Sequence, residues 1–228
     1  MSICTDRALP HKELILGTHV IPGLWLLQGG TVGGGGTLRW FKQEFGEGLS
    51  FDRLTAEAEA VAPGSDGVVF LPYMAGERSP IWNPDAKGVF YGLSFDKTRG
   101  HMIRALLEGV AFSLEHNLRV AAQTGAVVDT LNAMGGASNS VLWTQIKADV
   151  TGKRIQVPTS DTATTLGAAL LAGVGCGVYR DYEEAVGRTI RITRVQEPNP
   201  ANREVYDRSM ELYLQLYEDL KVTFSRFR

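Results

Sequence analysis

The chain reads Met134-Gly135-Gly136-Ala137-Ser138-Asn139-Ser140 at the junction between a predicted strand, residues 128–134, and a predicted helix, residues 139–150. The two adjacent glycines would let a flat ring or a ribose approach the backbone, because no Cβ stands in the way. The helix that follows presents free N–H groups in its first turn, which suits a nucleotide. The alternative is a tight turn between strand and helix, with Ser138 or Asn139 as the N-cap.

Strands and helices alternate on both sides of this turn. The clearest helix is predicted over residues 101–124, since apolar residues line one face and Gly125 stands where a C′ glycine would end it. Further along, a strand is expected at 154–157 and a helix, built mostly from Leu and Ala, at 164–172. A last helix is predicted to begin at Asn199-Pro200, a cap followed by proline.

The first part of the chain is predicted to combine short strands with helices. The expected strands are 2–5, 19–21, 24–28, 68–71 and 88–93, and the expected helices are 37–45 and 51–61. Hairpin-like strands followed by strand–helix units fit an α/β fold in which helices flank a mixed β-sheet. We expect a single domain over residues 1–228, because no repeat or low-complexity linker divides the chain.

The composition is typical of a soluble globular protein. Of the 228 residues 44% are hydrophobic, and 25 acidic against 23 basic side chains give a net charge of −2. This balance argues against nucleic acid or anionic lipid as a partner. Two cysteines, Cys4 and Cys176, are too few for a disulfide framework, so a reducing cytoplasm is expected, and no signal peptide is recognised. The uncharged stretch 162–179 is interpreted as a buried helix with its exit loop, not as a membrane span.

Two further segments are candidates for ligand binding. Glycines 33–36 precede a predicted helix, where successive amides could bind phosphate; the alternative is a flexible hairpin tip. Residues 71–88 form a loop rich in proline and charge, interpreted either as a ligand contact or as a structural loop braced by Trp82 and an ion pair. In that loop Glu77 and Arg78 could pair with each other or with surrounding backbone.

Five short motifs follow one another in a recognisable order. They are Pro72-Tyr73 with Gly76-Glu77-Arg78-Ser79-Pro80, the stretch 88–93 leading to Arg104-Ala105-x-x-Glu108-Gly109, Gly135-Gly136-Ala137, Trp143-x-Gln145-x-x-Ala148-Asp149, and Leu166-Gly167-Ala168-Ala169. Taken together, they resemble the C-terminal half of the FGGY family of carbohydrate kinases. The resemblance runs from the start of the chain to about Val186.

The resemblance implies a ribonuclease H-like fold, similar to that of actin and hexokinase, in which two domains close over ATP, Mg²⁺ and a sugar. This chain would be the second domain, which holds most of the adenosine. Gly136, next to Gly135, would then back the adenine or ribose, and Ser140 would stand where some members place an asparagine toward the base. Gly35 and Arg39 would line the nucleotide site near its phosphates.

In this family the catalytic aspartate and most sugar ligands precede the point that corresponds to the start of this chain. We therefore expect no catalytic residue and no metal ligand here, and an N-terminal sugar-binding domain outside the chain. The implied activity of the complete kinase is transfer of the ATP γ-phosphoryl group to a sugar hydroxyl. Segments 73–80 and 143–149 favour D-xylulose, whereas 81–83 and 101–104 also resemble gluconokinases. A non-catalytic nucleotide-binding module is the second hypothesis, and a homodimer is left open.

Overall fold

The computed structural model describes residues 1–159 and 163–226. Its first sheet is antiparallel, in the order β1-β3-β2. The strands are β1 (Ser2–Thr5), β2 (Ile15–Thr18) and β3 (Trp25–Gln28). The predicted strand at 19–21 is wrong, because these residues form the turn between β2 and β3. The Ile21 amide donates to His19 Nδ1 at 3.0 Å, which holds the turn closed.

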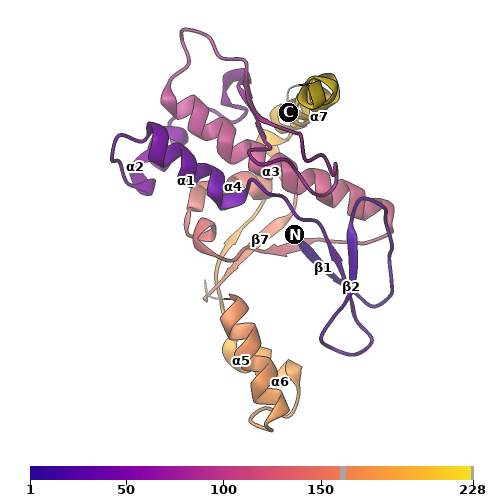
Figure 1. Ribbon diagram of the computed structural model, residues 1–228. Helices are drawn as coiled ribbons and strands as arrows, with labels where there is room; N and C mark the ends of the chain where they lie inside the picture. The colour runs from indigo at the N-terminus through magenta and orange to yellow at the C-terminus, as the bar shows by residue number, and fades with distance from the viewer. Residues whose placement is uncertain (160–162, 227–228) are drawn as a thin grey trace.

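A long central helix organises the middle of the chain (Figure 1). The elements here are α1 (Gly34–Phe45), α2 (Phe51–Glu59), the short 3₁₀ turn η1 (Ser65–Gly67), β4 (Val69–Pro72), β5 (Gly88–Tyr91) and α3 (Arg99–Gln123). The central helix α3 packs on α2 and β4. At Gly109 the two backbones meet so closely that a Cβ would lie 2.2 Å from the Phe70 carbonyl oxygen. Only glycine fits this contact.

The predicted mixed sheet follows α3. Its strands are β6 (Thr130–Asn132), β7 (Arg154–Pro158) and β8 (Ile192–Gln196), with β6 parallel and β8 antiparallel to the middle strand β7. Helix α4 (Val141–Thr151) joins β6 to β7 and ends at Gly152, whose φ is 64°. The sequence analysis missed β8, because its two apolar residues are both exposed and give no buried run.

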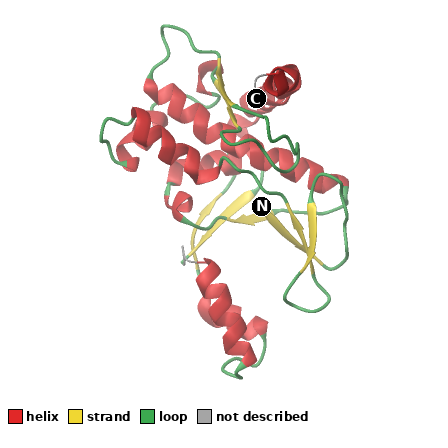
Figure 2. Cartoon of the chain, in the orientation of Figure 1, coloured by secondary structure: helices red, strands yellow, loops and turns green. Residues whose placement is uncertain are grey.

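The two three-stranded sheets lie beneath α3 (Figure 2). Ile3 of β1, Leu27 of β3 and Leu118 of α3 belong to one small apolar cluster, and Leu131 of β6 packs against it. The larger core lies on the other side, where α3 meets β4, α1, α2, α4 and the last helix. The fold is therefore a set of sheets flanked by helices, with the turn at residues 135–140 on the α4 side.

The segment between β7 and β8 departs from the sequence analysis. Helices α5 (Ala163–Gly175) and α6 (Tyr182–Thr189) pack on each other and project away from the sheets (Figure 1). The stretch 162–179 was predicted to hold a buried helix, but no residue of α5, all of which is described, is buried. Leu171 is 37% exposed and Val178 63% exposed. Thr162 itself lies outside the described residues.

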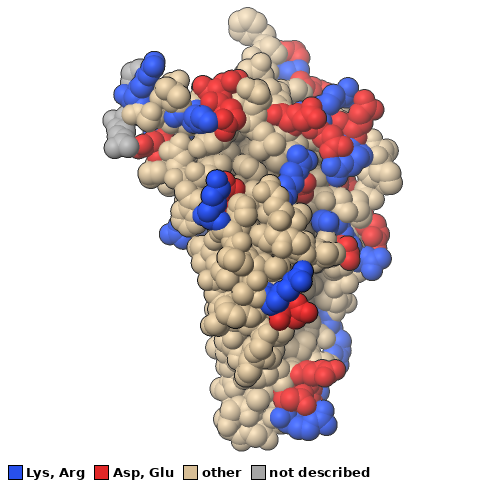
Figure 3. Space-filling model, turned by 90° about the vertical axis from the view of Figure 1, so that its right-hand side faces the viewer, with Lys and Arg blue, Asp and Glu red and all other residues tan. Residues whose placement is uncertain are grey.

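The helices of the structure were also compared with what a membrane span requires. Within residues 1–159 and 163–226, no helix combines the length and apolarity that crossing a membrane requires. On the face shown in Figure 3, acidic and basic side chains are interspersed, with broad uncharged areas between them.

The chain ends in a helix that closes the larger core. Asn199 accepts a hydrogen bond from the Ala201 amide at 3.1 Å and so starts η3 (Pro200–Asn202), which leads into α7 (Arg203–Arg226). This confirms the predicted Asn–Pro start. Tyr206 of α7 donates to Glu108 Oε1 at 3.0 Å, and Arg104 donates to the same oxygen at 2.8 Å. A buried polar network thus joins α3 to α7.

His116 on α3 makes the stability of the fold pH-dependent. Burial lowers the pKa of this imidazole from 6.5 to about 4. A depressed pKa in the folded state contributes stability that is present above pH 6.5 and is lost as the pH falls toward 4. We expect this residue to reduce the free energy of unfolding by on the order of 2 kcal/mol between pH 7 and pH 5.

Urea unfolding of the wild type and of His116→Gln at both pH values measures this contribution as a difference. The comparison is needed because buried carboxylates such as Glu115, whose pKa burial raises, respond to pH in the opposite sense. Parallel pH dependences of the two proteins would contradict the assignment to His116.

Candidate functional site

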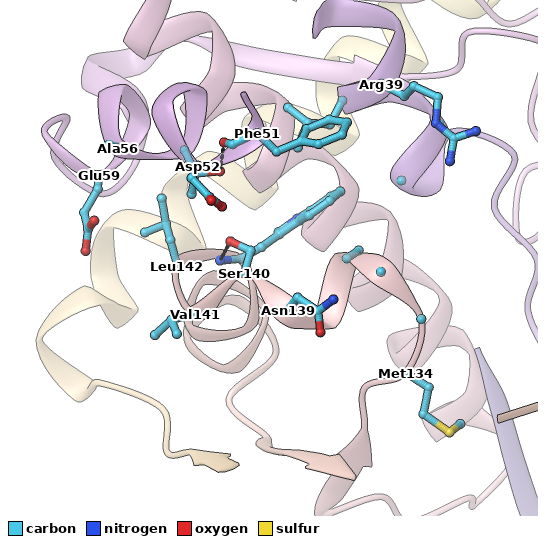
Figure 4. A pocket seen from close by; sticks show the side chains of 18 residues that line it. Arg39, Phe51, Asp52, Ala56, Glu59, Met134, Asn139, Ser140, Val141 and Leu142 are labelled. Atoms are coloured by element: carbon cyan, nitrogen blue, oxygen red, sulfur yellow. Dashed lines mark hydrogen bonds between the residues drawn. The ribbon is translucent and has the colours of Figure 1, made fainter. Parts of the chain in front are cut away.

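A cavity of about 850 Å³ opens between two parts of the chain that are far apart in sequence. One wall consists of α1 and α2, and the other of the turn after β6 together with the start of α4 (Figure 4). All five residues proposed from the sequence line this one cavity: Gly35, Arg39, Gly135, Gly136 and Ser140. The structure therefore brings together two glycine segments that the sequence places about a hundred residues apart.

The turn after β6 is built to leave room in the cavity. Gly135 has a φ of 83°, a conformation that favours glycine. The Ser138 hydroxyl donates to the Gly135 carbonyl oxygen at 2.7 Å and closes the 3₁₀ turn η2 (Gly136–Asn139). A Cβ placed on Gly136 would meet no heavy atom within 4 Å. The space beside Gly136 is open to a ligand.

Ser140 has a structural role and a place in the cavity wall. Its Oγ accepts from the Trp143 amide at 3.2 Å, so Ser140 is the N-cap of α4. The structural interpretation of the turn is thus correct in kind, but the cap is neither Ser138 nor Asn139. In Figure 4 Ser140 and Asn139 lie along the lower wall of the cavity.

The second glycine segment is the first turn of a helix, not a hairpin tip. Helix α1 begins at Gly34, and its N-cap Gly33 supplies no side-chain cap. The N-cap side chain therefore binds none of the first amides of α1. These amides lie at the positive end of the helix dipole. A Cβ on Gly35 would lie 3.9 Å from the Ala137 Cβ, which places this helix end against the turn after β6.

Helix α2 supplies a wall that the sequence analysis did not predict. It buries Leu54 and Ala58, and the adjoining face lines the cavity with Phe51, Asp52, Thr55, Ala56 and Glu59. The helical spacing of Leu54 and Ala58 could have identified that outer face, but not what it faces. Figure 4 shows Asp52 and Glu59 on this wall, away from Arg39 of α1. The cavity therefore carries a cation toward one end and carboxylates toward the other.

The loop at residues 71–88 does not line this cavity. The Glu77 carboxylate accepts from the Thr31 hydroxyl, the Val32 amide and the Arg78 amide, each at 2.8 Å. Trp82 Nε1 donates to the Glu13 carbonyl oxygen at 2.9 Å. Burial raises the pKa of Glu77, and these donors oppose the shift. Of the two interpretations, the structure supports a braced loop, whose Glu77 bonds to Thr31 and Val32, the segment just before α1.

The solved structures that superpose on this chain include xylulose kinases. Xylulose kinase from Rhodospirillum rubrum superposes with a TM-score of 0.88 at 32% identity, over 98% of this chain and 46% of that one. The fold is accordingly the ribonuclease H-like, actin-like α/β domain that the resemblance implied.

The sequence comparisons then define the family. Residues 6–176 match the C-terminal domain of the FGGY family of carbohydrate kinases, and the chain belongs to that family. It is 31% identical over 210 residues to the xylulose kinase of Staphylococcus epidermidis, covering 92% of this chain and 42% of that protein. It is 34% identical over 213 residues to the gluconokinase of Bacillus licheniformis, covering 89% and 41%. The chain thus spans less than half the length of these relatives.

Proposed function

We propose that this chain is the C-terminal, ATP-binding domain of a carbohydrate kinase, which transfers the γ-phosphoryl group of ATP to a sugar hydroxyl. The observation that carries the proposal is that Gly136, with its open face, the start of α1 and Arg39 all line the same cavity of about 850 Å³. When bound, ATP supplies the phosphoryl group. The chain's own contribution is to bind and orient it.

The residues divide along the cavity according to their chemistry. Gly136 leaves space for the adenosine, and Ser140 offers a hydroxyl toward the base. The first amides of α1 and the guanidinium of Arg39 attract the phosphates. In the described part of the chain, no group of three or more His, Cys, Asp or Glu side chains is placed to hold a metal. We therefore propose that Mg²⁺ enters the cavity bound to the phosphates of ATP.

We propose D-xylulose as the sugar, with gluconate as the alternative. Several similar proteins are named xylulose kinases, and the segments 73–80 and 143–149 support that choice. Gluconokinases at 34% and 36% identity favour the alternative. The other half of the relatives' length corresponds to a part of the kinase outside this chain. That part would bind the sugar and supply the general base that deprotonates the sugar hydroxyl. The apolar helix α5 offers that part a surface to pack against.

The isolated 228-residue chain should bind ATP weakly and phosphorylate no sugar. Half of the nucleotide contacts and the base for the sugar hydroxyl would be missing, so we expect a dissociation constant on the order of 0.1–1 mM. Isothermal titration with Mg-ATP measures the dissociation constant. Mass spectrometry after incubation with Mg-ATP and D-xylulose detects any sugar phosphate.

The complete kinase, assayed in parallel with D-xylulose and gluconate, tests the proposed activity itself. Phosphorylation of one of the two sugars is the expected result, and it also decides between them. Turnover by the isolated chain would contradict the assignment of the base to another domain. A complete protein that binds ATP but phosphorylates no sugar would support the non-catalytic module instead.

A further inference from the structure

We propose that Arg194 of β8 is a positioning residue for the nucleotide, because it holds the turn at residues 135–140 in place from behind. This inference rests on the proposed ATP-binding role of that turn. Arg194 Nη2 donates to the Ser138 carbonyl oxygen and, at 3.4 Å, to Thr144 Oγ1. One guanidinium thus joins the turn before α4 to the first turn of α4 itself.

The two acceptors are buried residues next to the ones that line the cavity, and they do not line it themselves. Ser138 is 3% exposed, and its amide and hydroxyl both bond to the Gly135 carbonyl oxygen, at 2.9 and 2.7 Å. Thr144 is fully buried, and its hydroxyl reaches the Ser140 carbonyl oxygen at 3.0 Å. Through Ser138 and Thr144, Arg194 is linked to the carbonyl oxygens of Gly135 and Ser140, which precede and follow Gly136 in the turn.

Strand β8 is well placed to supply this support. It pairs with β7, and Arg194 stands opposite Val157 in the antiparallel register. Gln196, two residues on and so on the same face of the strand, donates to Gln145 of α4 at 3.3 Å. The strand thus contacts α4 at two points. Arg194 does not line the cavity, so it would act through the turn and not by touching the nucleotide.

A purely structural role explains Arg194 poorly. Its Nε and the Gln196 Oε1 are both buried without a partner among the described residues, an arrangement that costs stability. Arg194 as a whole is only partly buried, so we expect an apolar side chain of similar length to replace it at a modest cost to folding. What the Arg194 guanidinium stabilises is the turn at residues 135–140, to which it donates its hydrogen bonds. Strand β8 also lies outside residues 6–176, the part that matches the family model.

The test is a comparison of Arg194→Met, Arg194→Lys and a matched control in the complete kinase. Methionine keeps the length and removes every donor, and we expect it to raise the KM for ATP about 10-fold while kcat and the KM for sugar change less than about 2-fold. Lysine keeps one charged donor and should recover part of the loss. The control is Arg191→Met, whose guanidinium bonds to the Gly187 and Ile190 carbonyl oxygens and not to the turn.

Titration with ADP, followed by intrinsic tryptophan fluorescence, gives a second readout without turnover, since Trp143 lines the cavity. The dissociation constant should rise in Arg194→Met and stay unchanged in Arg191→Met. An unchanged affinity, an equal loss for nucleotide and sugar, or failure of Arg194→Met to fold would each overturn the proposal. A wild-type kinase that binds no adenine nucleotide would instead overturn the proposed function.

Discussion

We expect Gly136→Leu to raise the KM of the complete kinase for ATP by at least about 30-fold, with the KM for the sugar nearly unchanged. The reason is spatial, because a side chain at this position would occupy the cavity. A Cβ there meets no heavy atom within 4 Å, so the leucine should fit without disturbing the fold. Steady-state kinetics with each substrate varied in turn measure the effect.

The matched control for this substitution is Gly17→Leu. Gly17 lies in β2, far from the cavity lining, and a Cβ there also meets nothing within 4 Å. It should leave the kinetics for both substrates unchanged. A correctly folded Gly136→Leu with an unchanged KM for ATP would show that the adenosine lies elsewhere.

The largest expected effect on stability is that of Glu108→Ala. The Glu108 carboxylate accepts from Arg104 at 2.8 Å, from Tyr206 at 3.0 Å and from the Gly64 amide at 3.0 Å, all in the buried core. Its removal leaves the Arg104 guanidinium buried without a carboxylate, which typically costs about 3–5 kcal/mol. Urea unfolding followed by circular dichroism should show a lower midpoint at an unchanged slope.

An ion pair with the same spacing serves as the control. Arg203 and Asp207 are also four residues apart on one helix, but their side chains are 44% and 43% exposed. Asp207→Ala should cost less than about 1 kcal/mol. Similar costs for the two substitutions would mean that burial does not determine the strength of the pair at Glu108.

Features with local chemical signals could be predicted from the sequence. The cap at Asn199 depends on a few neighbouring residues, and the structure confirms it. The glycine turn was also recognisable as a place without side chains. Its contact with the start of α1 was expected only from the resemblance, because no local pattern relates residue 35 to residue 136.

Features that depend on distant contacts could not be predicted in this way. Helix α2 was found, but its role as a cavity wall depends on what packs opposite it. Strand β8 carries no apolar run, yet pairing with β7 fixes it. Helix α5 was expected to be buried because Leu and Ala occur all around it, and burial within the chain does not follow from composition alone.

The exposed helix α5 has a consequence for how folding free energy is distributed. Its apolar surface gains stability only when another surface removes it from water, and that gain grows with the area covered. A surface that covered α5 would therefore be expected to raise the free energy of unfolding of this chain. A substitution in the exposed face of α5 could then lower the melting temperature of such an assembly, even where no residue of the cavity has changed.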